Sequence, residues 1–287
     1  MASIPRKVED RLIDGLKRFQ PILASARARD VNEADTVVIV TDLLADLLGY
    51  DKYTEITREY AIRGTICDLA IKLDDQPKLL IEVKAIGLDL RDQHVKQAID
   101  YAANKAIDWA ILTNGATWRV YRVIFAKPVD QELVVEFDLT TLNPRSASHL
   151  ELLYPLTRDG MLKAALQDYH AQRQAMSRFS LAALLLSEPM LKILRRELRR
   201  LSPEVSVDIE EIRAVLADEV LKREVVEGEK AEEARKKIQR MLRRQLRTTQ
   251  ARTEQGGLAT EAEEEVSESV EVQGEEAAQK AATHGEE

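Results

Sequence analysis

Two short apolar segments joined by a polar turn constrain this chain more than any other feature of its sequence. Residues 65–71 and 80–85 each have the length and composition of a buried β-strand, so we expect a β-hairpin. Asp68 lies in the first segment, and Glu82 and Lys84 lie one residue apart in the second. The hairpin therefore brings acidic and basic side chains into an apolar setting.

The alternation of side chains along a strand decides how these charges are arranged. Glu82 and Lys84 point to the same face, and Asp68 can lie beside Glu82 if the strands pair. Burying a neutral polar group without a partner costs roughly 2–7 kcal/mol, and a charge costs more. A metal ion held between the two carboxylates would offset this cost. Alternatively, the charges mark a solvent-facing strand, on which a Glu-x-Lys pattern is also common.

An Asp on one strand followed by Glu-x-Lys on the next resembles the motif of the PD-(D/E)xK nuclease superfamily. Asp68, Glu82 and Lys84 occupy the motif positions, and Cys67 stands where the name of the motif has proline. Two further pieces make the resemblance more specific. Residues 47–51 before the hairpin and 111–118 after it look like the N-terminal nuclease domain of type I restriction enzyme R subunits.

The helix expected after the hairpin extends this resemblance. Gln97 and Tyr101 match a Gln-x-x-x-Tyr element that follows the catalytic hairpin in some superfamily members. The similarity as a whole covers roughly residues 30–139. In the family this element lies next to the active site, so both residues are candidate catalytic residues. Spacing alone favours a helix that carries one amide and one half-buried tyrosine, and the resemblance is what points to a role in the site.

The resemblance implies a Mg²⁺-dependent DNA endonuclease of the restriction type, for which Mn²⁺ can replace Mg²⁺. Asp68 and Glu82 would hold the metal, and the backbone carbonyl of Val83 would supply a third oxygen. Lys84 would orient or activate the attacking water and balance charge on the phosphate. Many superfamily members add an acid from the first core helix, and Glu33 lies at about that place. Glu33 could instead complete a capping box with Asp30.

Two hypotheses other than a nuclease remain open. The chain could be a binding module that uses a nuclease fold to hold DNA or a partner with weak or no catalysis. It could also be an assembly partner in a defence complex, built on its C-terminal helices. The sequence contains no Gly-x-x-x-x-Gly-Lys-Ser/Thr phosphate loop, so we expect no nucleotide cofactor and no ATP motor.

Hydrophobic periodicity predicts an α/β core, a mixed sheet flanked by helices. Helices are expected at residues 6–26, with Pro21 bending or ending the first, at 30–49, stopped by Gly49, and at 90–105. Strands are expected at residues 53–60, 64–85 as the hairpin, 109–113, 117–125 and 132–139, with an Asn114-Gly115 turn.

The composition changes after Pro144, and this predicts three parts: a nuclease-like domain at 1–143, a helical region at 144–253 and an acidic disordered tail at 254–287. Helices are expected at residues 148–169, 181–201, 208–226 and 229–247. The tail has eleven glutamates against the single Lys280, a net charge of −10; the whole chain carries −8, so the rest carries +2. The basic residues of 229–247 could contact DNA, form a homodimer or pair with the tail.

The remaining composition limits the class of protein. One cysteine, Cys67, allows neither an internal disulfide nor a cysteine zinc site, and we expect it to be a small buried hydrophobe. The N-terminus lacks the apolar core of a signal peptide, and the apolar runs are too short to span a bilayer. We therefore expect a soluble cytoplasmic protein that does not bind membranes.

Overall fold

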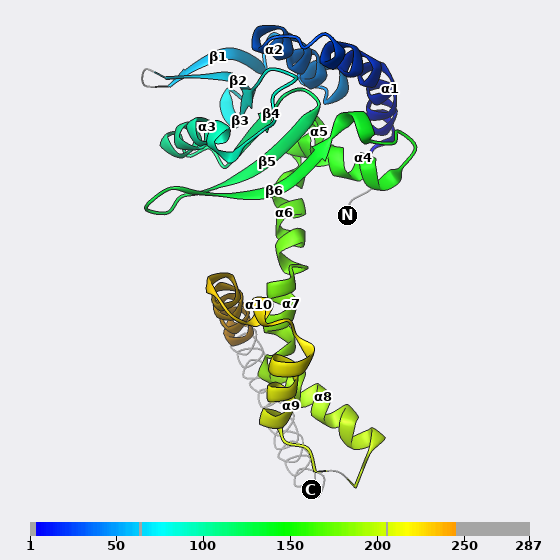
Figure 1. Cartoon of the computed structure of the whole chain (residues 1–287), viewed down its shortest axis with the longest axis vertical. Coiled ribbons are helices and arrows are strands. Elements are labelled where there is room, and N and C mark those ends of the chain that lie inside the picture. Colours follow the sequence, from blue (N-terminus) through cyan, green and yellow to red (C-terminus); the bar gives the residue numbers. More distant parts are fainter. Residues whose placement is uncertain (1–3, 63–64, 205, 245–287) are drawn as a thin grey trace, which may run out of the picture. The chain divides into compact units, whose positions relative to one another are not determined.

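A six-stranded mixed sheet lies at the centre of the first part of the chain (Figure 1). The structure is a computed structural model that describes residues 4–62, 65–204 and 206–244. Its strands are β1 (Ile56–Ile62), β2 (Thr65–Leu73), β3 (Gln76–Val83), β4 (Trp109–Thr113), β5 (Thr117–Ile124) and β6 (Asp130–Asp138). They follow one another in sequence order across the sheet, and only β3 and β4 run parallel. This confirms the predicted α/β core.

Helices cover both faces of this sheet. They are α1 (Arg6–Ala28), α2 (Glu33–Asp42) with the π-helical turn η1 (Leu43–Leu47), and α3 (Asp92–Asn104). After the sheet come η2 (Leu139–Thr141), α4 (Ala147–Leu153), η3 (Tyr154–Leu156), α5 (Arg158–Leu162) and α6 (Ala165–Ala175). The chain divides into two compact units, the first ending at Arg173 and the second beginning at Gln174. The sheet belongs to the first unit.

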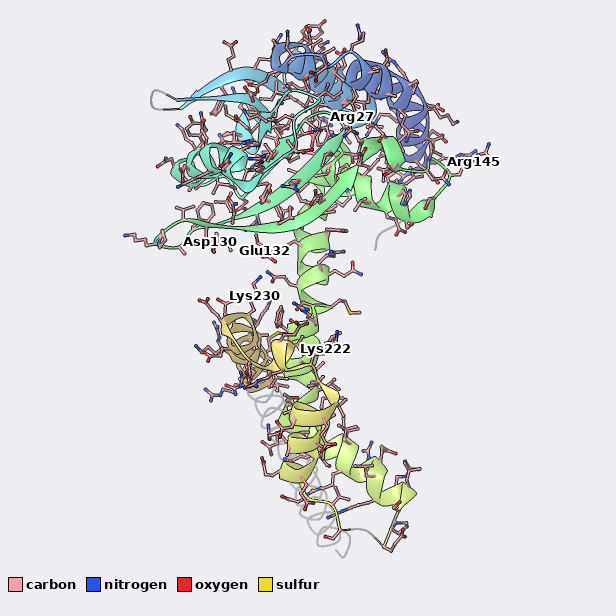
Figure 2. All side chains as sticks on the ribbon, viewed as in Figure 1. Arg27, Asp130, Glu132, Arg145, Lys222 and Lys230 are labelled. Carbon is pink, nitrogen blue, oxygen red and sulfur yellow. The ribbon has the colours of Figure 1, made fainter. Side chains whose placement is uncertain are left out.

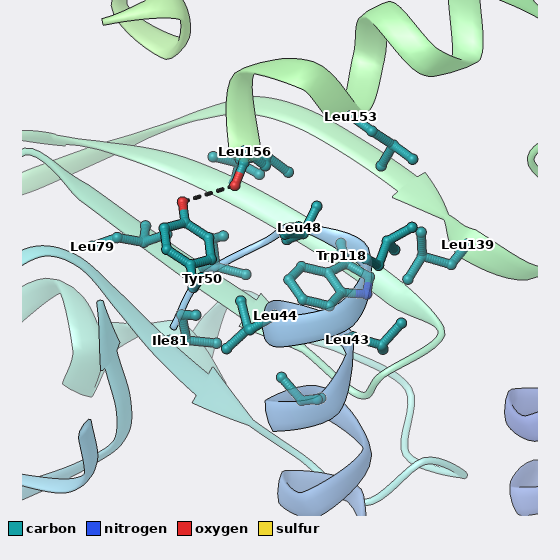
Figure 3. Close-up of a cluster of buried hydrophobic side chains, with 14 of the residues drawn as sticks. Leu43, Leu44, Leu48, Tyr50, Leu79, Ile81, Trp118, Leu139, Leu153 and Leu156 are labelled. Atoms are coloured by element: carbon teal, nitrogen blue, oxygen red, sulfur yellow. Dashed lines mark hydrogen bonds between the residues drawn. The ribbon is translucent and has the colours of Figure 1, made fainter. Parts of the chain in front are cut away.

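The larger hydrophobic core lies between the sheet and the helices α1, α2 and α4. Alternate residues of the hairpin, including Leu69, Ile81 and Val83, are fully buried in it. Figure 3 shows part of this cluster, in which Tyr50 lies among leucine side chains and its hydroxyl donates to the Leu156 carbonyl at 2.8 Å. Burial of the ring with its hydroxyl satisfied ties the segment after η1 to η3.

The smaller core lies on the opposite face of the sheet, under α3. Ala70 and Leu80 contribute from the hairpin, and Val95, Ala98 and Ala102 contribute from the helix; all five are fully buried. The connection from β3 through α3 to β4 joins two parallel strands, which require a crossover of this kind. Asp68, Glu82 and Lys84 belong to the same alternating sets as Ala70 and Leu80, so they point toward this face.

The β2–β3 hairpin has the predicted turn and an added irregularity. Asp74 and Asp75 form the tip, and both have positive φ (51° and 58°), as a two-residue hairpin turn with the twist of the strands requires. A bulge shifts the register between Ile71 and Lys72. The pairing ends where Leu69 meets Ile81, so the strands are no longer paired as a ladder beyond that point.

The structure contradicts an end of the first helix at Pro21 and an Asp30 cap on the second helix. The first helix continues through Pro21 to Ala28, because Phe19, Leu23 and Ala26 are buried on both sides of the proline. That burial outweighs a cost of about 3 kcal/mol for proline within a helix. The second helix does not begin at an Asp30 cap: Asp30 has φ 49°, and the Asn32 side chain accepts from the Asp35 amide. Asn32 is therefore the N-cap.

The strand expected at residues 53–60 begins later, at Ile56. Asp51 accepts hydrogen bonds from the amides of Tyr53 and Thr54 at 2.9 and 2.7 Å and so holds these residues in a turn. The other strands agree with the prediction to within two residues. Arg27 lies in the last turn of α1 (Figure 2), which places a cation at the negative end of the helix dipole. Its guanidinium lies 3.9 Å from the Asp138 carboxylate.

The helices predicted after the sheet are more fragmented than expected. The second unit contains α7 (Arg178–Leu185), α8 (Glu188–Leu201), α9 (Ile209–Val215), η4 (Leu216–Val220), α10 (Arg223–Val226) and a helix at 229–244. The predicted helix at 148–169 breaks around Pro155, and the one at 181–201 breaks at Ser187, which precedes α8. Both breaks lie where serine or proline favours a helix start over continuation.

Part of the expected organisation falls outside the described residues. The predicted acidic tail at 254–287 and the last residues of the helix predicted at 229–247, including Arg247, lie outside the described residues. Within residues 4–62, 65–204 and 206–244, no helix has both the length and the apolar character needed to cross a membrane.

Gly49 ends the α2–η1 helix, as predicted, and Arg11 fastens this end to α1. Gly49 has φ 85°, and its amide donates to Ala45. The Arg11 guanidinium donates to the carbonyls of Leu47 and Leu48, each at 3.3 Å. A side chain on Gly49 would come within 2.6 Å of Arg11 Nη1. This glycine therefore allows both the backbone conformation and the position of the arginine.

We expect Gly49→Ala to cost more stability than Gly115→Ala, because both sites have positive φ but only Gly49 lacks space. Gly115 has φ 83° with its nearest neighbour at 3.4 Å, so its substitution should cost about 1–2 kcal/mol for the backbone alone. Loss of the Arg11 hydrogen bonds should add about 1–3 kcal/mol at Gly49. Urea unfolding measures both. The difference should disappear in an Arg11→Ala background; a difference that persists there would contradict this account.

Candidate active site

The candidate site lies where the β2–β3 ladder ends. The last pair of the ladder is Leu69–Ile81, and one step beyond it the register places Asp68 opposite Glu82. The Asp68 carboxylate accepts a hydrogen bond from the Val83 amide at 2.7 Å. The Asp68 side chain thus takes the place of a backbone partner for this amide. This hydrogen bond holds the acid against β3 at the point where the ladder ends.

Glu82 and Lys84 form a partly buried ion pair. Lys84 Nζ lies 2.8 Å from Glu82 Oε1 and 3.7 Å from Glu33 Oε2. The Glu82 side chain is 8% exposed and that of Lys84 is 18% exposed. These values rule out a solvent-facing strand, one of the two interpretations of the Glu-x-Lys pattern.

One oxygen of Glu82 has no partner among the described residues. Glu82 Oε2 is buried and accepts no hydrogen bond. Leaving a buried acceptor of a charged group unsatisfied costs on the order of 1–3 kcal/mol or more. The arrangement is therefore unfavourable for folding unless another group binds this oxygen.

The electrostatics of the site follow from burial and from the nearby acids. Burial raises the pKa of Glu82, and the charges of Asp68 and Glu33 raise it further, while Lys84 opposes both. Burial alone would lower the pKa of Lys84, but the hydrogen bond to Glu82 and the three carboxylates outweigh it and raise this pKa. Lys84 is therefore held as a cation by the acids around it.

The structure places the other predicted site residues on three elements: α2, β3 and α3. Glu33 is the first residue of α2 and reaches Lys84, so Lys84 lies between two acids from different elements. Its predicted capping-box role is wrong, because Asn32 caps the helix. The Val83 side chain points into the larger core, so only its backbone could take part in the site.

Gln97 and Tyr101 form a hydrogen-bonded pair on α3. Gln97 Nε2 donates to the Tyr101 hydroxyl at 2.6 Å, and Tyr101 is 5% exposed. The tyrosine belongs to the smaller core, on the face of the sheet toward which the three charged residues point. The described contacts thus give one group of Asp68, Val83, Glu82, Lys84 and Glu33, and a second pair on the helix that covers that face.

The residues present fit a divalent cation in part. Hard cations prefer carboxylate and carbonyl oxygens, and Asp68 and Glu82 offer carboxylates with one buried oxygen still unpartnered. Among the residues that the structure describes, no group of three or more His, Cys, Asp or Glu side chains is placed to hold a metal ion. A cation here would therefore need the Val83 carbonyl or water as further ligands.

Cys67, next to Asp68, is a structural residue. Its side chain is fully buried, and its thiol donates to the Ile81 carbonyl at 3.3 Å. Burial, with the nearby Glu82 carboxylate, raises the pKa of this thiol to about 12. The thiol is therefore protonated and unreactive at neutral pH, which confirms the prediction of a small buried hydrophobe.

Sequence reasoning missed one polar residue near the site. The sequence predicts only that Asn114 belongs to a turn. In the structure its side chain is 3% exposed and donates to the backbone carbonyls of Ile86 and Leu88, in the segment that follows Lys84. An asparagine in a tight turn gives no signal of such a long-range contact.

We expect Glu82→Gln to stabilise the fold near neutral pH. Because the pKa of Glu82 is raised, ionisation costs more in the folded protein than in the unfolded chain. The contribution of Glu82 is therefore fully present below about pH 4.3, the unfolded-state value, and is lost as pH rises through the folded-state pKa. Urea unfolding between pH 4 and 8 should give the variant a larger free energy of unfolding than the wild type at pH 7. The two values should be equal at pH 4. Asp75→Asn at the exposed turn controls for the loss of one charge; a destabilised Glu82→Gln protein at pH 7 would count against this reading.

Comparison with known families agrees with these observations. Residues 35–134 match the family described as Type I restriction enzyme R protein N terminus (HSDR_N). The matched segment contains Asp68, Glu82, Lys84, Gln97 and Tyr101, and it starts just after Glu33. No curated protein and no solved structure matches the chain. Over residues 35–134 the chain is therefore similar to the N terminus of type I restriction enzyme R proteins, which confirms the resemblance predicted from its motifs.

Proposed function

We propose that this chain is a Mg²⁺-dependent endonuclease of the restriction type that hydrolyses phosphodiester bonds in DNA. The observation that carries the proposal is the group of Asp68, Glu82 and Lys84 at the open end of the hairpin, with one Glu82 oxygen buried and unpartnered. A buried acid whose charge the fold disfavours is typical of a functional site. The match to restriction enzyme R proteins over residues 35–134 supports the same reaction.

In this proposal Asp68 and Glu82 hold the cation, with the Val83 carbonyl and water as further oxygen donors. Glu33, which lies 3.7 Å from Lys84, would join them only after a movement of its side chain. A bound Mg²⁺ would polarise the phosphate and lower the pKa of a bound water. The protein prepares for this in two ways. The Val83 amide fixes one oxygen of Asp68, and the unpartnered Glu82 oxygen is available without breaking an existing hydrogen bond.

Lys84 supplies positive charge that does not depend on the cation. Its ammonium has three donors, and the contact with Glu82 uses one of them. The remaining donors can hold a water or a phosphate oxygen, where the ammonium stabilises the negative charge that builds up in the transition state. Gln97 and Tyr101, paired on α3, would contact the nucleic acid or support Lys84 from the helix side.

We expect Asp68→Asn, Glu82→Gln and Lys84→Met each to lower the rate of plasmid cleavage by about 100-fold or more, because each removes a ligand or a stabilising charge. The assay follows the conversion of supercoiled plasmid to linear DNA in the presence of Mg²⁺, Mn²⁺ or EDTA. Two substitutions elsewhere on the hairpin are matched controls: Asp74→Asn at the turn and Lys78→Met on β3, both at exposed positions. These controls should cleave at the wild-type rate.

The same assay separates the enzyme from a binding module. Gel-shift titration of the wild-type protein with the same DNA, in Ca²⁺ or EDTA, measures binding without cleavage. Tight binding with no cleavage in any divalent cation would favour the binding module over the enzyme. Cleavage by Lys84→Met at the control rate would overturn the role given to the lysine.

We also expect Mg²⁺ to raise the melting temperature of the wild-type protein, because a ligand that binds only the folded state stabilises it by mass action. The double variant Asp68→Asn/Glu82→Gln should lose this shift, and calorimetry should show no binding. Asp74→Asn/Asp75→Asn removes the same number of charges from the turn and should keep both signals. An unchanged shift in the site variant would place the cation elsewhere.

A further inference from the structure

The segment between β3 and α3, residues 84–91, connects the two halves of the candidate site. Lys84 is its first residue, Glu82 lies on β3 just before it, and Gln97 and Tyr101 lie on the helix that follows it. The segment is neither strand nor helix, so its conformation depends on how its backbone polar groups are satisfied. That conformation sets the distance and the angle between the strand and the helix.

Asn114 satisfies two carbonyls of this segment. Its Nδ2 donates to Ile86 at 3.3 Å and to Leu88 at 3.0 Å, while its Oδ1 accepts from the Thr117 amide at 2.8 Å. Both amide N–H groups and the carbonyl oxygen are thus used, and the partners allow only this orientation of the carboxamide. The side chain is 3% exposed, so water does not compete for these bonds.

Arg119 holds the next carbonyl of the same segment. Its Nη1 donates to the Leu90 carbonyl at 3.0 Å. Its Nε bonds to Glu136 Oε1 at 3.0 Å, across the β5–β6 pairing in which the two residues are partners. The carbonyls of alternate residues, Ile86, Leu88 and Leu90, are therefore bound by two side chains from the β4–β5 hairpin.

The opposite side of the segment is confined by the connection between α1 and α2. A side chain on Gly87 would overlap the carboxylate of Asp30, so any larger residue there would require the Asp30 side chain to move. The same connection leads into α2, where Glu33 reaches Lys84. The segment thus passes between Asp30 on one side and Asn114 on the other.

We propose that Asn114 and Arg119 are positioning residues of the active site: they brace residues 86–90 and so set Gln97 and Tyr101 against Glu82 and Lys84. The inference rests on the proposed nuclease function. Neither residue needs to touch the substrate. Small displacements of positioned groups cost large factors in rate, so loosening the brace should lower turnover more than it weakens DNA binding.

The test uses Asn114→Asp in the full chain. Aspartate keeps the shape and the acceptor for the Thr117 amide, but it turns an oxygen instead of an NH₂ group toward the Ile86 and Leu88 carbonyls. Thr113→Val is the matched control, because the Thr113 hydroxyl bonds only within the turn, to the Thr117 carbonyl and the Gly115 amide. Both residues are buried in the same turn. Comparing the two variants therefore separates the effect of the Asn114 bonds to residues 86 and 88 from the effect of disturbing the turn itself.

We expect Asn114→Asp to lower kcat on the order of 10-fold, the lower end of the range for groups that orient active-site residues, with KM for DNA little changed. Amide hydrogen exchange should speed up at residues 86–90 and at the start of α3 while β2 and β3 stay protected. Thr113→Val should change neither. Mg²⁺ binding should be retained, because Asp68 and Glu82 lie on the strand side of the brace.

The outcomes that would overturn the inference are distinct from those that test the nuclease itself. No cleavage by the wild-type protein would overturn both proposals. Wild-type cleavage with an undiminished Asn114→Asp rate, or an equal loss in Thr113→Val, would overturn the brace alone. If Asn114→Asp does not fold, Arg119→Met carries the test by removing the Leu90 contact, with Glu136→Gln as its control and partial rescue expected in Arg119→Lys.

Discussion

Burial of the Glu82 carboxylate is the constraint on which the local structure of the hairpin depends. Its charge is unfavourable in the smaller core, and the fold compensates with Lys84, two residues along the same face and 2.8 Å away. Glu33 approaches from α2, and Asp68 is fixed by the Val83 amide. One buried oxygen of Glu82 still has no partner. This burial costs stability, and the proposed role in the site would explain why an acid occupies the position.

Because side chains alternate along each strand, the apolar residues of the larger core and the charged residues of the candidate site lie on opposite faces of the hairpin. One face of the hairpin sends Leu69, Ile81 and Val83 into the larger core, which is covered by α1, α2 and α4. The other face carries the charged residues and is covered by α3. The parallel β3–β4 pair makes this arrangement possible, because its crossover must pass over one face and does so as α3. The chain thereby brings a second pair of polar residues, Gln97 and Tyr101, to the face with the acids.

Most strands and helices of the first unit could be predicted from local sequence, and the wrongly predicted helix ends and caps have identifiable causes. The hairpin, the β4–β5 turn and α3 are specified by patterns that span only a few residues. Pro21 remains within α1 because tertiary burial on both sides of it outweighs its local cost. Asn32 caps α2 instead of Asp30, a choice between two capable residues that depends on where the chain turns. Helices with weak burial, such as those after Pro155, break where local signals allow a new start.

The sequence by itself determined the residue types of the site and their faces, since a period of two places Glu82 and Lys84 together in any strand. The tertiary structure alone decided their burial, the opening of the ladder beside Asp68 and the approach of Glu33 to Lys84. It also decided that Asn114 reaches the carbonyls of Ile86 and Leu88, which lie more than twenty residues earlier in the chain. Periodicity is a property of neighbouring residues and is therefore visible in sequence. Contacts between distant segments depend on how whole elements pack, and the local patterns of a single sequence contain no direct record of them.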